Sequence, residues 1–422
     1  MNKDILKFLD QSPTAFGAVK SIKEILIEKG YKELKDKIEK GKKYYVVRND
    51  SSIIAFNVGK KLKNPSLLIS ASHTDCPTFK LKPNPIIKSE LGAKLNVESY
   101  GGLLTRAFFD RALSLAGRVM VKGKNGISSI NYKDEKPFCI MPAMAPHLYR
   151  GGEDKKADVA VDMVPFVSLN KDFDFNNYLA SNLKKKKEDI VGFDLYLYPL
   201  DKAYIWGENN EFITSGHIDN LECAYTTLMG FVDNFNDENI NIYASFDNEE
   251  VGSLTRQGAD SDFLYATINR ICNDLKLNYD KLVENGMLLS CDNAHGIHPN
   301  HPELYDKDNS PVLNGGVVIK FNANQSYTSD SLSSSLLMEL MRKNKVDYQL
   351  FSNKTGLRGG STLGNLSTRH VSIMSVDIGL AQWAMHSVVE TAGSKDVDTM
   401  IKLIKCFYKS HLTVKDNCYR LD

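Results

Sequence analysis

Ile240–Phe246 (INIYASF), followed by 247–253 (DNEEVGS), is the stretch that decides the fold of this chain. The first part is a short apolar run and predicts a strand buried inside a sheet. Two adjacent carboxylates, Glu249 and Glu250, come directly after it. Burying one acid beside another raises a pKa or requires a cation, so the pair predicts one carboxylate on a metal and one that moves protons. A solvated turn is the alternative, because most carboxylates are exposed.

Other apolar runs have the lengths and spacings of strands and helices in an α/β protein. Residues 44–48 and 52–58 alternate like the strands of a hairpin, and 66–71 is typical of a strand buried on both faces. An amphipathic helix is predicted to begin after a cap at 12–14. Further strands are predicted at 287–291 and 317–320, and further helices at 221–232, 262–275, 330–341 and 396–408.

The middle of the chain, from 88 to 214, changes to short β-like segments, turns and clusters of charge. This predicts a β-rich domain inserted into a main domain that is formed by 1–87 and 215–422. The length agrees with two domains, because 422 residues exceed what one compact core normally holds. The lysine run 184–187 is interpreted as a solvated face.

The charge balance excludes some classes of partner. The chain has 53 basic and 52 acidic residues and no strongly one-sided segment. This argues against a nucleic-acid groove and a polybasic membrane surface, so small or neutral partners fit better. No apolar run reaches membrane-spanning length, and a cytoplasmic location is predicted.

The seven cysteines are scattered without any C-x-x-C spacing. This argues against a disulfide framework and against a cysteine zinc site. Reduced thiols are therefore expected.

Several polar residues lie where predicted strands end or a helix begins. His73 follows the strand at 66–71, and Asp75 could orient its imidazole as metal-bound histidines require, although an H-x-D pair alone is weak evidence. Asp219 begins the helix near 221, where a carboxylate is either an ordinary cap or a metal bridge. His147 is the one histidine between 88 and 214.

In open α/β sheets ligands bind outside the carboxyl ends of the strands, so residues far apart in sequence can meet there. Two imidazoles and three carboxylates share that placement and suit two zinc-like ions without a thiolate. The five are His73, Asp219, Glu250, Asp292 and His386. Glu249 is then left to act as a base.

A set of ordered motifs resembles those of the aspartyl aminopeptidase family, and the match runs through nearly the whole chain. The motifs are 72–77 (SHTDCP), 109–111 (FDR) with 115–119 (LAGRV), 219–221 (DNL), 247–253 (DNEEVGS), 294–295 (AH) with 298–300 (HPN), and 384–387 (AMHS).

The resemblance implies a metal-dependent exopeptidase that releases N-terminal aspartate or glutamate from peptides. It implies a three-layer α/β/α metallopeptidase domain with a mixed central sheet and an inserted β-rich oligomerisation domain. Two divalent ions per subunit are expected, zinc first, with cobalt or manganese as alternatives. Self-association into a homododecamer built from dimers is expected, with no nucleic-acid or membrane partner.

The resemblance also implies residue roles. The metal ligands would be His73 and Asp292 on one ion, Glu250 and His386 on the other, and Asp219 as the bridge. Glu249 would activate a water molecule between the metals as general base, and Asp75 would orient His73. The substrate pocket would be lined by His147 from a neighbouring subunit, His295, Lys320 and Tyr327.

Four positions depart from the family pattern, and none is an expected ligand. His217 replaces a usual arginine, Ala112 an acid, Asn293 a methionine and Cys76 a serine. These departures bear on substrate preference. His217 is expected to be structural or to support a ligand, with direct metal binding as the alternative.

Two other functions fit the same residues. A broader aminopeptidase or an N-acyl amino acid deacylase would use the same two-metal site. A non-catalytic oligomeric binding protein with this fold is a further alternative, but an intact Glu249 argues against it.

Overall fold

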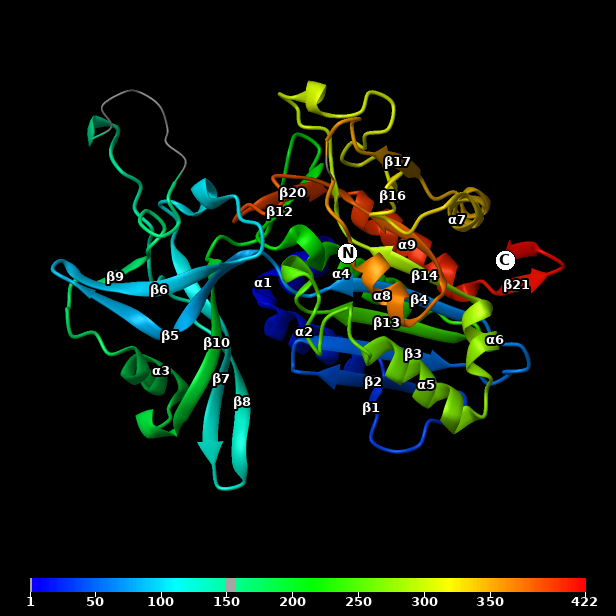
Figure 1. Cartoon of the computed structure of the whole chain (residues 1–422), viewed down its shortest axis with the longest axis horizontal. Helices are drawn as coiled ribbons and strands as arrows, with labels where there is room; N and C mark the ends of the chain where they lie inside the picture. The colour runs from blue at the N-terminus through cyan, green and yellow to red at the C-terminus, as the bar shows by residue number, and fades with distance from the viewer. Residues whose placement is uncertain (1, 149–156, 358) are drawn as a thin grey trace. The chain divides into compact units, whose positions relative to one another are not determined.

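The computed structural model describes residues 2–148, 157–357 and 359–422 (Figure 1). The chain divides into two compact units. Unit 1 comprises Met1–Asp75, Ala203–Met385 and Glu390–Asp422, and unit 2 comprises Cys76–Lys202 and His386–Val389. The junctions predicted at 87/88 and 214/215 fall inside strands β5 (Thr78–Ser89) and β12 (Phe212–Ser215).

Unit 1 is built on a nine-stranded mixed sheet. Its order is β1 (Lys32–Glu33), β2 (Lys43–Arg48), β3 (Ser52–Val58), β13 (Ile240–Phe246), β4 (Leu67–His73), β14 (Gly286–Cys291), β18 (Met374–Gly379), β16 (Val317–Phe321) and β17 (Tyr348–Ser352). Four neighbours in the middle, β13, β4, β14 and β18, are parallel to one another. Their carboxyl ends therefore share one edge of the sheet.

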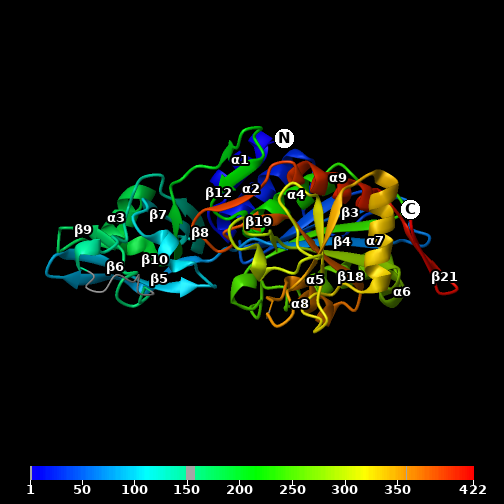
Figure 2. The ribbon, with the colours of Figure 1, turned by 90° about the horizontal axis from the view of Figure 1, so that it is seen from above.

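Helices cover both faces of this sheet, which makes unit 1 a three-layer α/β/α domain (Figure 2). One face carries α1 (Asn2–Gln11), α2 (Ala15–Glu28), α4 (Ile218–Phe231) and α9 (Asp396–Lys409), and α7 (Ser331–Asn344) packs against α9. The other face carries α5 (Phe263–Leu275), α6 (Tyr279–Glu284) and α8 (Leu363–His370).

The middle strand β4 is buried on both faces, as its continuous apolar run predicts. Leu67, Ile69 and Ala71 lie in a core cluster that also contains apolar residues of α5. On the opposite face the Ser70 hydroxyl lies 2.6 Å from the Tyr408 hydroxyl of α9. Because successive side chains alternate, each face of β4 packs against a different helical layer.

The predicted elements of unit 1 are confirmed. The helix expected after 12–14 is α2, and the Thr14 side chain caps it by accepting from the Gly17 N–H at 3.4 Å. The strand predicted for the stretch INIYASF is β13, and its bounds are the predicted ones. The helices predicted near 221, 262, 330 and 396 are α4, α5, α7 and α9.

Unit 1 also contains two smaller sheets. One has the order β11 (Tyr204–Trp206), β12, β20 (Glu390–Gly393), β19 (Ala381–Trp383) and β15 (Ala294–His295). The other is the hairpin β21 (Leu412–Lys415) with β22 (Cys418–Leu421).

Unit 2 is the β-rich part of the chain. Its six-stranded sheet has the order β8 (Gly126–Lys133), β7 (Leu113–Gly123), β10 (Ile190–Pro199), β5, β6 (Gly92–Tyr100) and β9 (Phe166–Ser168). All its neighbouring strands are antiparallel. One helix, α3 (Phe175–Leu183), is capped by the Asp174 side chain. The lysines at 184–187 are exposed, as predicted.

All seven cysteines are free thiols, which agrees with the predicted absence of disulfides. Within the described ranges, none of the helices combines the length and the apolar character needed to cross a membrane.

Candidate metal centre

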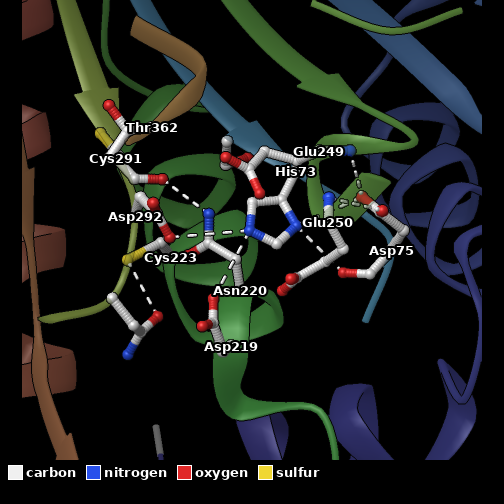
Figure 3. Close-up of polar contacts among 12 residues, drawn as sticks. His73, Asp75, Asp219, Asn220, Cys223, Glu249, Glu250, Cys291, Asp292 and Thr362 are labelled. Atoms are coloured by element: carbon white, nitrogen blue, oxygen red, sulfur yellow. Dashed lines mark hydrogen bonds and ion pairs between the residues drawn. The ribbon is translucent and has the colours of Figure 1, made fainter. Parts of the chain in front are cut away.

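The strand register brings the predicted site residues of unit 1 to one edge. Across the parallel pair β13 and β4, Phe246 is paired with His73. Across β14 and β4, Ser290 is paired with Ala71. The residues that follow these strands therefore leave the sheet side by side, and Figure 3 shows their side chains turned toward one another.

His73 is the centre of this cluster and is 1% exposed. Its Nδ1 lies 3.0 Å from the Asp75 carbonyl oxygen and 3.3 Å from the Asp75 carboxylate. Its Nε2 lies 3.5 Å from Asp219 Oδ1 and 3.6 Å from Asp292 Oδ1 (Figure 3). Burial opposes the charged ring, yet Asp219, Asp292 and Asp75 raise the pKa of His73 well above its usual range. One nitrogen is thus oriented by Asp75 while the other faces two carboxylates, the arrangement of a metal-binding histidine.

Asp75 also holds the turn that carries the two glutamates. Its Oδ1 accepts from the Glu249 N–H at 3.1 Å and its Oδ2 from the Glu250 N–H at 3.2 Å. The carboxylate therefore links the end of β4 to the turn after β13.

The turn itself depends on Asn248, which is left-handed at φ 64°. Asparagine tolerates that conformation better than most residues. Its side-chain oxygen accepts from Thr255 Oγ1 and Gln257 Nε2, both at 2.8 Å. Glu249 and Glu250 are half-buried in a fixed turn, so the solvated-turn alternative does not hold.

The surroundings of the two glutamates favour their protonated forms. Burial raises the pKa of Glu249 to about 8; His73 opposes this shift and Asp292 adds to it. Burial likewise raises the pKa of Glu250 well above its usual range, and repulsion from Asp219 adds to the effect. A cation among these carboxylates would relieve the repulsion.

Asp219 lies near the start of α4, but the N-cap position is His217. Asp219 and Asn220 have non-helical backbone angles and are joined by a cis peptide bond. The Asp219 N–H donates to Glu390 Oε2 at 2.9 Å. Asp219 is therefore not at the N-cap position of α4, and its role as a metal bridge stays a prediction.

Asp292 is positioned by the neighbouring strand β18. Its N–H donates to the Ile378 carbonyl at 2.9 Å. A Cβ at Gly379 would lie 1.8 Å from the Asp292 carbonyl oxygen, so this close approach requires glycine.

The donor set fits a divalent metal. The carboxylates Asp75, Asp219, Glu249, Glu250 and Asp292 lie in this region together with the His73 imidazole and the Lys320 ammonium. The ligand atoms of His73, Asp219 and Asp292 lie within 4.8 Å of one another. The same holds for the group of His73, Glu249 and Glu250, and for the pair Asp219 and Glu250. Burial raises the pKa of Cys223 and Cys291 far above the usual range, so thiolates are not available. Imidazole and carboxylate donors of this kind suit zinc.

Two predicted pocket residues, Lys320 and Tyr327, lie beside the cluster. Lys320 is 3% exposed, and its Nζ donates to the Asn293 carbonyl at 2.7 Å and lies 3.7 Å from Asp292 Oδ2. Burial opposes its charge, but Asp292, Tyr327 and Asp377 together outweigh burial and the pKa of Lys320 is raised. Its ammonium is also 5.5 Å from the centre of the Tyr327 ring. His295 is exposed in β15.

Two other predicted site residues belong to unit 2. His147 is exposed in the 3-10 turn Pro146–Leu148. His386 lies in the segment His386–Val389, and its carbonyl accepts from the Leu104 N–H at 3.0 Å. Their roles at the metal centre stay predictions.

The departures at His217 and Asn293 have different surroundings. Burial lowers the pKa of His217 to about 4, so its ring is neutral. Asn293 is 3% exposed and its Nδ2 donates to Glu222 Oε2 at 2.8 Å. Sequence reasoning missed Glu222, and the available signal was an acid within the apolar face of the helix that follows Asp219.

The fold and the donor set define a metal-binding α/β protein with an acid-lined strand edge. The chain belongs to the Aminopeptidase I zinc metalloprotease (M18) family, whose pattern matches residues 8–408. This confirms the family resemblance of the motifs. The protein is therefore a metal-dependent aminopeptidase, and the family description names zinc.

Individual relatives agree over almost the full chain. The chain is 42% identical to the "Probable M18 family aminopeptidase 2" of Clostridium novyi (strain NT), with 96% of this chain and 98% of the relative covered. Its fold matches a chain in the cryo-EM structure of the Ape4 and Nbr1 complex, with TM-score 0.91, 32% identity and coverage of 97% and 85%. It also matches the S. cerevesiae mApe1 dodecamer, with TM-score 0.85, 25% identity and coverage of 97% and 96%.

Proposed function

We propose that this aminopeptidase releases N-terminal aspartate and glutamate from peptides by means of two divalent ions. The observation that carries the proposal is the position of His73, whose Nδ1 faces Asp75 while its Nε2 faces Asp219 and Asp292. The Glu249 turn is tied to the same aspartate, Asp75. Ligands and base are thus held by one network.

The proposed ligands divide between two ions. His73 and Asp292 would hold the first, Glu250 and His386 the second, and Asp219 would bridge them. The oxygen and imidazole donors support zinc, with cobalt or manganese as alternatives. When bound, two such cations would lower the pKa of a water molecule and polarise the scissile carbonyl.

Glu249 is the proposed general base. It is half-buried, and its N–H is held by Asp75. It would accept the proton of the attacking water and pass it to the leaving amine, a contribution of about 10²- to 10⁴-fold.

We assign the preference for acidic N-terminal residues to the positive charge of Lys320. Lys320 carries a charge that burial has not removed, and its place beside Tyr327 supports a role in pairing with an acidic substrate side chain. His295 would line the same pocket. The balanced net charge supports small peptides as substrates, and a cytoplasmic location stays a prediction.

Self-association is proposed from the relatives. The similar S. cerevesiae mApe1 is a dodecamer, and a homododecamer built from dimers through unit 2 is the assembly proposed for this chain. His147 would then reach the active site of a neighbouring subunit and donate to the oxyanion that forms.

One observation favours the broader aminopeptidase as a second candidate. The Lys320 ammonium already donates to the Asn293 carbonyl and pairs with Asp292, so less of its charge is available to a substrate. The N-acyl deacylase is separable from both, because a site that grips a free amine rejects an acylated one.

The test is hydrolysis of matched peptides that begin with Asp, Glu, Leu or N-acetyl-Asp, before and after chelation. The proposal predicts chelator-sensitive release that is fastest for Asp or Glu. Faster release of Leu would replace the acidic specificity with the broader one. Faster cleavage of the acetylated peptide would replace the aminopeptidase reaction with deacylation.

A further inference from the structure

Two short segments carry Asp219 and Asp292, and hydrogen bonds tie them together on both sides of Asp292. Before it, the Cys291 carbonyl accepts from Asn220 Nδ2 at 2.8 Å (Figure 3). After it, Asn293 Nδ2 donates to Glu222 Oε2 at 2.8 Å. The carboxylate of Asp292 is therefore held between two anchors on α4.

Asn293 is also the point where Lys320 is attached. Its main-chain carbonyl accepts from Lys320 Nζ at 2.7 Å, and its side-chain oxygen lies 3.3 Å from the Cys223 thiol, which donates to it. The side chain is thus fixed at both ends of its amide. A rotation of this residue would move the carbonyl that holds Lys320.

The Glu222 carboxyl is buried, and Asn293 is its side-chain hydrogen-bond partner. It is 2% exposed, and its Oε1 is buried without a hydrogen-bond partner among the residues that the structure describes. A buried carboxyl is unfavourable unless it is hydrogen-bonded, and the bond from Asn293 supplies that compensation. Neither residue is within the proposed ligand set.

We propose that Glu222 and Asn293 form a positioning pair that fixes Asp292 and Lys320 relative to Asp219. The pair sets both the metal affinity at Asp292 and the placement of the Lys320 ammonium. The inference rests on the proposed two-metal function.

The test is a double-mutant cycle on the full-length chain. The variants are Glu222→Met, Asn293→Met and the two together, with Glu222→Gln as the conservative control. Zinc affinity of the metal-stripped protein is measured by competition with a chelator, and KM and kcat are measured separately for Asp and Leu peptides.

Each single methionine variant should weaken zinc binding by about 10- to 100-fold, the range for residues that support a metal ligand. Asn293→Met should also raise KM for the Asp peptide more than for the Leu peptide, because Lys320 is displaced. The double variant should lose about as much affinity as either single variant, because each single change already breaks the same hydrogen bond between Asn293 and Glu222. Glu222→Gln keeps an acceptor oxygen and should bind zinc as wild type does.

The positioning role of the pair would be excluded if the single variants bind zinc like wild type. It would also be excluded if the double variant shows the sum of both losses. Equal changes in KM for both peptides would exclude it as well. If a single variant does not fold, the double variant and Glu222→Gln still decide, because wild-type zinc binding by the folded double variant, or weak zinc binding by Glu222→Gln, contradicts the proposal. A wild-type chain that binds no metal would instead refute the proposed function itself.

Discussion

Buried or partly buried carboxylates occur in both units, but the two units compensate them differently. In unit 2, Asp194 lies 3.0 Å from Lys80 Nζ and 2.9 Å from Arg118 Nε. Burial would raise the pKa of Asp194, but these two cations lower it below its usual value. At the strand edge of unit 1, burial and mutual repulsion raise the pKa of Glu249 and Glu250.

The difference shows where a cation from outside the chain is needed. The single carboxylate of Asp194 lies beside two cationic side chains, so residues of the same unit balance its charge. The unit 1 cluster has more carboxylates than cationic partners, so folding alone leaves an excess of negative charge. Metal ions would supply the balance there.

The largest expected effect is that of Glu249→Gln. Loss of the proton acceptor should lower kcat by about 10²- to 10⁴-fold while metal content stays unchanged, because Glu249 is not a proposed ligand. Peptide hydrolysis and elemental analysis measure the two quantities. Glu284→Gln, which changes an exposed glutamate of α6, is the matched control. Full activity in Glu249→Gln would exclude the base role.

His147→Phe tests whether a residue of unit 2 takes part in catalysis. If His147 donates to the oxyanion in a neighbouring subunit, kcat should fall by about 10²-fold with unchanged metal content. The exposed His370 provides the control His370→Phe. Loss of metal in His147→Phe would count against a role across a subunit boundary.

Glu249 in unit 1 and Asp194 in unit 2 should respond to pH in opposite directions. The pKa of Glu249 rises from 4.5 to about 8 on folding, so the metal-free folded chain binds more protons than the unfolded chain in that window. Its contribution to stability therefore falls as pH rises from about 4.5 to about 8. The lowered pKa of Asp194 gives stability that is present above 3.8 and lost as pH falls through the folded value.

Melting temperatures of the metal-stripped and zinc-loaded protein at about pH 5 and about pH 8 measure this difference. The stripped protein should lose more stability at the higher pH than the loaded protein, because zinc favours the ionised carboxylates. An identical pH response of both forms would contradict the cluster's excess charge.

The smallest effect is expected for Asp194→Asn. This change leaves two partly exposed cations without their acid and should cost about 1 kcal/mol or less, the range for exposed ion pairs. Metal content and turnover should not change. Chemical denaturation measures the stability, and a loss of bound metal would show that Asp194 and the strand-edge carboxylates of unit 1 are not independent.

Much of the site was predictable because local patterns fix where strands end. The apolar runs placed His73, Glu249, Glu250 and Asp292 at strand ends, and the parallel register then makes them neighbours. The contact between His73 Nδ1 and the Asp75 carboxylate, at 3.3 Å, was predictable because the two residues are only two positions apart. The role of Asp75 in orienting a metal-bound His73 stays a prediction.

Contacts between distant segments were not predictable in the same way. The bond from Lys320 to the Asn293 carbonyl depends on β16 running antiparallel to β18, which no local pattern specifies. The bond from Asn293 to Glu222 depends on how α4 packs over the sheet. Propensity and periodicity describe single elements, while these bonds are set by the register between elements.

The central claim is that the strand-edge carboxylates of unit 1 are balanced by bound metal. Isothermal titration of zinc into the metal-stripped full-length chain, with His73→Ala as the comparison, tests it most directly. Two zinc ions per wild-type chain and at least one fewer in His73→Ala are predicted. A wild-type chain that takes up no zinc, cobalt or manganese would contradict the account.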